Sequence, residues 1–234
     1  MAIRKRATTQ PMKTGRTPNR KLGVPSRPLL LIGAGAGCGR CSRPGRSVNC
    51  GTAAVVSALR LSARAMLPFY RTVATDRAFA RRWSDNVVGL RLDGMKRQLK
   101  HAAPLAARLQ KGIGTNGIGY FIDYPAPGTA DVFATGVTIP PGTLQFYFSS
   151  AAHGAVAADL LPFCRALAAN HAYAAALVAA MDAADARAAE ALVRSRVRSG
   201  ALRTVDAAPD YLALDFKPAG SRYIYRSLFF REGV

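Results

Sequence analysis

Cys164 and His171 are the two side chains whose spacing could support nucleophilic catalysis, because an imidazole can deprotonate a thiol. Seven positions separate them, so on an unbroken helix they share one face but stand about 10 Å apart along the axis. That separation is too long for a thiolate–imidazole pair unless the helix breaks, and Asn170 could supply the break. The structural alternative is a core cysteine and a hydrogen-bonded histidine. We therefore assign no catalytic residue and keep Cys164 and His171 as the candidates.

Three further cysteines lie near the N-terminus, and one pair of them has a spacing typical of zinc sites. Cys38 and Cys41 are separated by two residues, and Cys50 follows. Structural zinc needs four ligands, commonly from two such pairs, and the nearest histidine is His101. One interpretation is a zinc site in which Cys164 supplies the fourth ligand. The alternative is three free thiols in a flexible arm. We predict no metal and no cofactor, with Cys38, Cys41 and Cys50 as the candidate ligands.

Residues 112–117 match the G-x-G-x-x-G pattern of dinucleotide-binding loops. Such a loop must follow a strand and open a helix, so that helical N–H groups reach the pyrophosphate. Here the pattern follows a predicted helix and opens a predicted strand, which is the inverse order. A turn is the simpler interpretation. The functional alternative is that the protein is an enzyme or a small-ligand binder, with a pocket near Cys164, His171 and the Gly112–Gly119 loop.

Charge is distributed unevenly along the chain. The first 75 residues hold 14 Lys and Arg and no Asp or Glu, residues 76–111 hold nine cations and three acids, and residues 112–234 hold ten of each. The net charge of +20 therefore belongs to the N-terminal half. Cations without neighbouring acids bind phosphate backbones with little sequence preference. The residues that we predict to contact nucleic acid or another polyanion are Arg4, Lys5, Arg6, Lys96, Arg97 and Lys100.

The basic N-terminal segment also fits three alternatives to polyanion binding. An Arg-rich, acid-free start is typical of an organellar targeting peptide, and the apolar run before Cys38 resembles a lipoprotein signal. GC-rich DNA also encodes Arg, Pro, Gly and Ala by composition. A start codon assigned too far upstream would therefore produce the same segment, and the true start would then lie near Met66. In that case the protein would have no polyanion-binding arm.

Aromatic and basic residues are interleaved from Arg222 to Arg226, in the order Arg-Tyr-Ile-Tyr-Arg. RNA-binding sheets stack bases on such rings, although this segment lacks the RRM signature. The alternative is a solvated edge strand that supplies Tyr and Phe to a core.

Hydrophobic periodicity predicts both helices and strands. Helical spacing dominates residues 52–111 and the Ala-rich residues 150–199. Thr75 or Asp76, and the Asn170–His171 pair, are expected to mark helix boundaries. Pro68 and Pro162 are expected to interrupt helices. Alternation of β-branched and aromatic residues predicts five strands, which are Ile118–Tyr124, Asp131–Thr138, Thr143–Phe148, Tyr211–Phe216 and Arg222–Phe230.

These elements predict an α+β fold, in which an antiparallel sheet of about five strands packs with Ala-rich helices. We expect a single domain over residues 52–234. It would run through helices at 52–111, strands at 118–148, helices at 150–199 and a hairpin at 210–230. Residues 1–51 contain no Phe, Tyr or Trp and are expected to form a disordered basic arm.

The expected function is binding rather than catalysis. The protein would be a non-enzymatic binding or accessory protein that contacts nucleic acid, another polyanion or a protein partner. Because Cys164 is the one cysteine in the predicted domain, a disulfide framework is not expected and the compartment is predicted to be reducing. No apolar stretch has the length of a membrane span. We predict a cytoplasmic location, with organelle targeting and lipoprotein-like export as alternatives.

Overall fold

The structure is a computed structural model that describes residues 50–125, 131–140, 142 and 145–232. Seven helices and six strands follow one another in this part of the chain. All described residues belong to one compact unit, Pro44–Val234. The residues predicted as a basic arm, up to position 49, lie outside the described part. The elements are α1 (Cys50–Thr75), α2 (Arg77–Val88), α3 (Leu92–Ala102), α4 (Pro104–Leu109), β1 (Gly112–Thr115), β2 (Gly119–Pro125), β3 (Val132–Thr138), α5 (Ser150–Ala169), α6 (His171–Asp182), α7 (Ala186–Arg194), β4 (Leu202–Ala208), β5 (Tyr211–Phe216) and β6 (Tyr225–Glu232).

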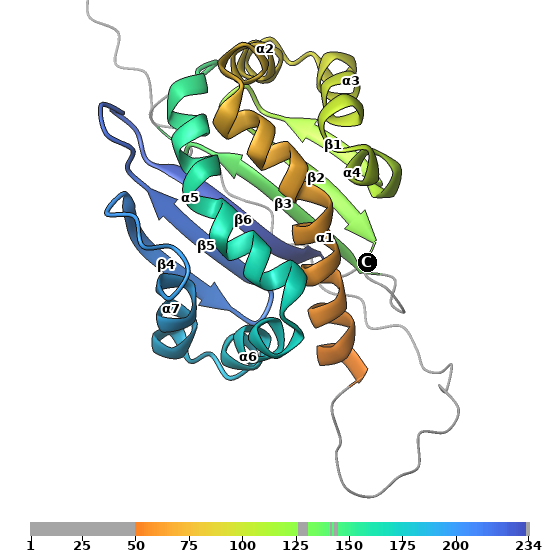
Figure 1. Ribbon diagram of the computed structural model, residues 1–234, viewed down its shortest axis with the longest axis vertical. Coiled ribbons are helices and arrows are strands. Elements are labelled where there is room, and N and C mark those ends of the chain that lie inside the picture. Colours follow the sequence, from red (N-terminus) through yellow and green to blue (C-terminus); the bar gives the residue numbers. More distant parts are fainter. Residues whose placement is uncertain (1–49, 126–130, 141, 143–144, 233–234) are drawn as a thin grey trace, which may run out of the picture. The chain divides into compact units, whose positions relative to one another are not determined.

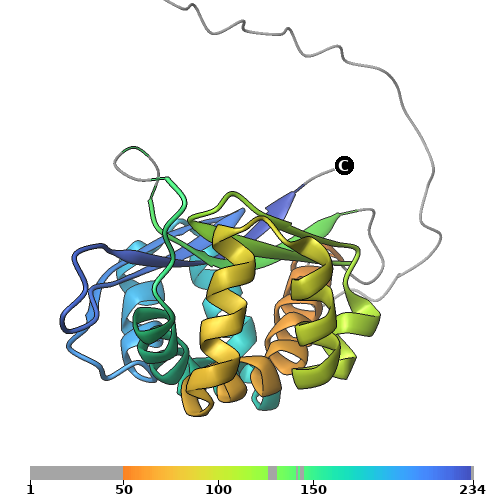
Figure 2. The same ribbon diagram turned by 90° about the horizontal axis from the view of Figure 1, so that it is seen from above.

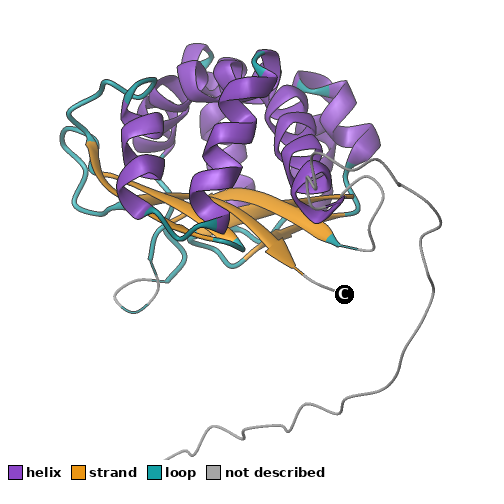
Figure 3. Cartoon of the chain, turned by 90° about the horizontal axis from the view of Figure 1, so that it is seen from below, coloured by secondary structure: helices purple, strands orange, loops and turns teal. Residues whose placement is uncertain are grey.

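The strands form one antiparallel sheet in the order β1-β2-β3-β6-β5-β4. The last strand of the chain, β6, therefore lies in the middle of the sheet. All the helices drawn in Figures 2 and 3 lie on one face of the sheet, and none covers the opposite face in the described part. The predicted α+β class is confirmed, with six strands where about five were expected.

α1 and α5 lie side by side across the sheet and separate it from solvent (Figure 1). Their inward faces contact every second residue of the strands, because successive side chains of a strand point to opposite faces of the sheet. Phe69 of α1 packs edge-to-face on Trp83 of α2 and on Tyr120 of β2, with ring centroids 4.5 and 5.9 Å apart. All three side chains are fully buried. This aromatic cluster holds the helix layer on the sheet.

Helix boundaries follow local side-chain hydrogen bonds. The carboxylate of Asp76 accepts from the backbone N–H of Phe79 at 2.9 Å and begins α2. The side chain of Asn170 accepts from the N–H of Tyr173 at 3.0 Å and begins α6. Both residues satisfy an N–H group that has no partner within its own helix. The boundaries predicted at these two residues are confirmed.

The predicted interruptions at Pro68 and Pro162 are wrong. Both residues lie inside continuous helices, α1 and α5. Each proline is exposed, so its ring points to solvent. A proline has no N–H to donate to the carbonyl one turn earlier, and that carbonyl can bind water instead. Tertiary packing of the opposite helix face outweighs the local cost of the proline.

One predicted strand is absent from the described residues, one is shifted, and two strands were not predicted. The strand expected at Arg222–Phe230 is β6, which begins at Tyr225 and lies inside the sheet rather than at a solvated edge. The strand expected at Thr143–Phe148 is not formed by residues 145–148, while 143 and 144 lie outside the described part. Phe146 has a φ of 54°, a left-handed conformation that a strand cannot contain. The sequence also failed to indicate β1, which is four residues with two glycines, and β4, whose exposed edge carries polar side chains without strict alternation.

Candidate polyanion-binding groove

The solvent-facing side of α5 between Ser150 and Pro162 consists mostly of small residues and forms the floor of three adjoining hollows. A hollow of about 430 Å³ lies where α5 meets α1 and α2. A second, of about 610 Å³, separates α5 from the segment that follows α7, and a third, of about 440 Å³, reaches β4 and the end of β5. The first and third share Ala155, and the second and third share Asp159 and Ser199. We call this continuous surface the α5 groove.

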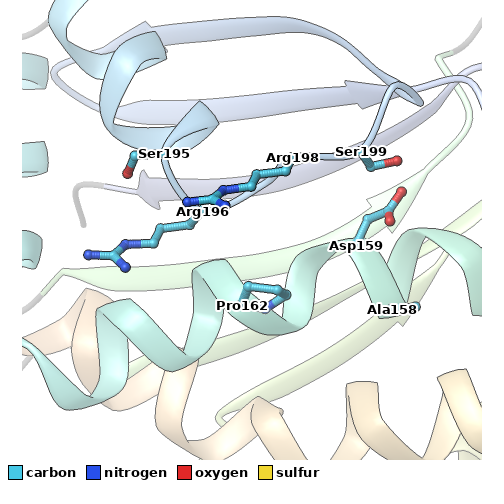
Figure 4. A pocket seen from close by; sticks show the side chains of 7 residues that line it. All are labelled: Ala158, Asp159, Pro162, Ser195, Arg196, Arg198 and Ser199. Atoms are coloured by element: carbon cyan, nitrogen blue, oxygen red, sulfur yellow. The ribbon is translucent and has the colours of Figure 1, made fainter.

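Cations from elements far apart in the sequence form the walls of the α5 groove. Arg77 and Arg81 come from α2, on one side of α5. On the other side, Figure 4 shows Arg196 and Arg198 across from Asp159 of α5. The complete set of wall cations is Arg77, Arg81, Arg196, Arg198, Arg203 and Lys217. Asp159 is the single acidic residue in the described lining of the three hollows.

None of the six wall cations enters an ion pair with a described residue. The ion pairs of the described part join Arg194 to Glu190, Arg226 to Asp215 and Arg231 to Asp131. The five wall arginines are exposed, and the ammonium of Lys217 is 2.6 Å from the carbonyl oxygen of Arg222. The α5 groove therefore has a positive charge that the described protein leaves almost uncompensated.

The floor of the α5 groove admits a close approach to the backbone. Ala151, Ala155 and Ala158 are exposed and carry no more than a methyl group. A linear polyanion can lie against such a floor while guanidinium groups from both walls reach its phosphates. Arginine suits this task because its planar donors can contact two phosphate oxygens at once.

A second cluster of exposed cations lies on α3, where the sequence predicted polyanion contact. Lys96 and Arg97 line a hollow of about 550 Å³ together with Arg91 and Asp93. Lys100 is exposed on the same helix. The other predicted contact residues, Arg4, Lys5 and Arg6, lie outside the described residues.

Cys164 and His171 are not brought together. Cys164 is completely buried in α5, and burial raises the pKa of its thiol to about 12, so it is protonated at neutral pH. His171 is exposed at the start of α6, where its Nδ1 lies 3.3 Å from Nη1 of Arg60. A protonated, solvent-inaccessible thiol cannot attack a substrate.

The Gly112–Gly119 loop lies at the opposite edge of the sheet from α6. β1 is one edge strand, whereas α6 packs against β4, the other edge strand. The N–H of Gly117 donates to Oγ1 of Thr115, and the N–H of Ile118 donates to the side chain of Asn116. These amides are occupied within the turn and are not arranged to bind a pyrophosphate.

The candidate zinc ligands lie largely outside the described part. Cys38 and Cys41 belong to the undescribed segment, and Cys50 is described only as the first backbone position of α1. Within the described ranges, no three His, Cys, Asp or Glu side chains lie close enough to hold a metal ion.

One buried polar cluster could not be recognised from the sequence. Nε2 of His153 lies 3.0 Å from the hydroxyl of Tyr120, in the core between α5 and β2. Burial lowers the pKa of His153 to about 3 and raises the pKa of Tyr120 well above its ordinary value. Both side chains are fully buried and therefore contribute to packing rather than to ligand contact.

No protein-family model, curated protein or solved structure matches the chain. No described helix is long and apolar enough to cross a membrane. The function must therefore be inferred from the side chains of the α5 groove themselves.

Proposed function

We propose that this protein binds a polyanion, that nucleic acid is the class of ligand, and that the α5 groove is the main described contact surface. The observation that carries the proposal is the set of wall cations without ion-pair partners. Desolvating an unpaired guanidinium against a phosphate costs less than breaking an existing ion pair, so such residues are available for a ligand.

The first four helices support the same function. From Arg60 to Arg108 the chain carries eleven Lys and Arg and three Asp or Glu. Ten of these cations are exposed, and none forms an ion pair with a described residue. A long-range positive potential of this kind accelerates association with an anionic polymer. Lys96, Arg97 and Lys100 would extend the contact beyond the groove, and the predicted Arg4, Lys5 and Arg6 would add to it.

We propose binding without catalysis, in an accessory role. An enzyme with a pocket near Cys164, His171 and the Gly112–Gly119 loop lacks comparable support, because these three features lie in different parts of the fold. The cytoplasm remains the predicted compartment, based on the cysteine usage of the sequence.

The test compares the affinity of the full chain and of two matched variants for a fluorescein-labelled 20-nucleotide DNA, by anisotropy in 150 mM salt. Replacing Arg196 and Arg198 by Gln removes two wall cations, and we expect binding to weaken by about tenfold. Replacing Lys111 and Arg187 by Gln removes the same charge from exposed positions outside the α5 groove. That control should change the affinity by less than about threefold. Equal effects of both double variants would refute the groove as the contact surface.

A further inference from the structure

Large aromatic side chains are exposed at the end of the sheet where α5 begins. Phe146 is 57% exposed and Tyr147 is 40% exposed, and Ile224 in the connection between β5 and β6 is 39% exposed. Few large apolar side chains of the described part reach this exposure, and the others, Leu90 and Leu92, lie at the turn between α2 and α3. Exposed aromatic rings that cluster in this way commonly mark a binding surface.

The rings are held in place by the surrounding backbone. Tyr147 packs edge-to-face on Tyr223 with centroids 5.2 Å apart. The N–H of Ser149 donates to the hydroxyl of Tyr225 at 2.8 Å, which fixes the chain after Tyr147 onto β6. The exposed rings therefore lie on an anchored loop, and binding to them would cost little ordering entropy.

Phe146 combines high exposure with an unusual backbone conformation. Its φ of 54° is left-handed, which is rare for a large side chain without an asparagine-like hydrogen bond. Its ring lies against Gly117, where a Cβ atom would come within 2.9 Å of it. Strained residues of this kind persist where the surroundings determine them, and they concentrate at ligand sites.

The aromatic rings adjoin the α5 groove through the β5–β6 connection. Lys217, a wall residue, donates to the carbonyl oxygen of Arg222 at 2.6 Å. The guanidinium of Arg222 lies 5.9 Å from the centroid of the Tyr223 ring, a cation–π geometry. Lys217 and Arg222 thus lead from the groove to the half-buried ring of Tyr223, on which the exposed ring of Tyr147 packs.

We propose that the ligand is single-stranded nucleic acid, with its phosphates in the α5 groove and its bases stacked on Phe146, Tyr147 and Tyr223. This inference rests on the proposed function and narrows its ligand. Combined basic grooves and aromatic platforms are the features that bind single strands, since every base offers a face for stacking. In a duplex those faces are already stacked on neighbouring base pairs, so exposed rings would be left without a partner.

The binding has two physically separable parts. The groove cations act on phosphates, and their effect depends on salt. The rings act on bases, and their effect depends little on salt. A polyanion without bases, such as inorganic polyphosphate, would use the groove alone.

The experiment measures the affinity of the full chain for a 20-nucleotide oligothymidylate, for a duplex of the same length and for inorganic polyphosphate. We expect the oligothymidylate to bind at least tenfold more tightly than the duplex. Replacing Phe146 and Tyr147 by Ala should weaken oligothymidylate binding at least tenfold. The same variant should bind polyphosphate within about twofold of the wild type.

Two further variants keep the test independent of folding defects. The control Tyr211→Ala removes a half-buried aromatic ring at the start of β5, away from the groove and the exposed rings, and should leave all three affinities unchanged. Phe146→Trp preserves a stacking ring, so it should retain affinity and show indole fluorescence quenching when the oligothymidylate binds.

The possible outcomes separate the two proposals. Equal affinity for single strand and duplex, or no effect of removing the two rings, would overturn the single-strand inference and leave polyanion binding intact. Loss of polyphosphate binding in the ring variant would also overturn it. No binding to any of the three polymers would refute both proposals and leave the exposed rings as a surface for a protein partner.

Discussion

Burial decides which titratable residues of this protein are available for chemistry. The cysteine and histidine with the most suggestive spacing in the sequence are separated by the fold, since Cys164 faces the core and His171 faces solvent. The histidine that the core does contain, His153, was not distinguishable in the sequence from a surface residue. Residue type and spacing alone cannot report depth, because depth is set by which helix face meets the sheet.

His153 should make the fold sensitive to acid. Its pKa is lowered by burial from 6.5 to about 3, so between these values the unfolded chain binds a proton that the folded chain does not. Stability is therefore lost as the pH falls below about 6.5, with a loss of about 2 kcal/mol between pH 7 and pH 5 from this residue. Urea unfolding of the wild type and of His153→Gln at both pH values measures it. The variant should lose less stability than the wild type over this interval, and equal losses would exclude His153 as the cause.

At the scale of helices and strands, the sequence was informative where a local interaction decides the structure. Asp76 and Asn170 begin helices because their side chains cap them. β2 and β6 alternate between buried and half-buried residues, whereas β3 and β5, which lie inside the sheet, are buried at nearly every position. The errors arise where tertiary contacts override local preference. Pro68 and Pro162 are tolerated because the opposite face of each helix is held in the core.

Asn170 offers a direct test of local capping. Asn170→Ala removes the acceptor for the N–H of Tyr173 and should lower the free energy of unfolding by about 1 kcal/mol. Asn170→Asp keeps an acceptor oxygen and should cost less than half of that. Denaturant unfolding of both variants provides the measurement. An aspartate variant as unstable as the alanine variant would contradict the capping role.

At the scale of the whole molecule, the α5 groove could not be predicted from the sequence. Its wall cations come from positions between Arg77 and Lys217, and only the packing of α2, β4 and the segment after α7 around α5 brings them together. The excess of positive charge could be predicted, and it pointed to the N-terminal half. The C-terminal half is neutral by count, but it adds Arg196, Arg198, Arg203 and Lys217 to the groove, and none of these enters an ion pair with a described residue.

The most direct test of polyanion binding is the salt dependence of the affinity of the full chain for a 20-nucleotide oligothymidylate between 50 and 200 mM salt. We predict a linear fall of the logarithm of the association constant with the logarithm of the salt concentration. Each phosphate contact should contribute about 0.7 to the slope for a single strand, so Arg196→Gln/Arg198→Gln should lower the slope by about 1.4. The control Lys111→Gln/Arg187→Gln should leave it unchanged. Affinity that does not vary with salt, or no binding at 50 mM salt, would contradict polyanion binding through the α5 groove.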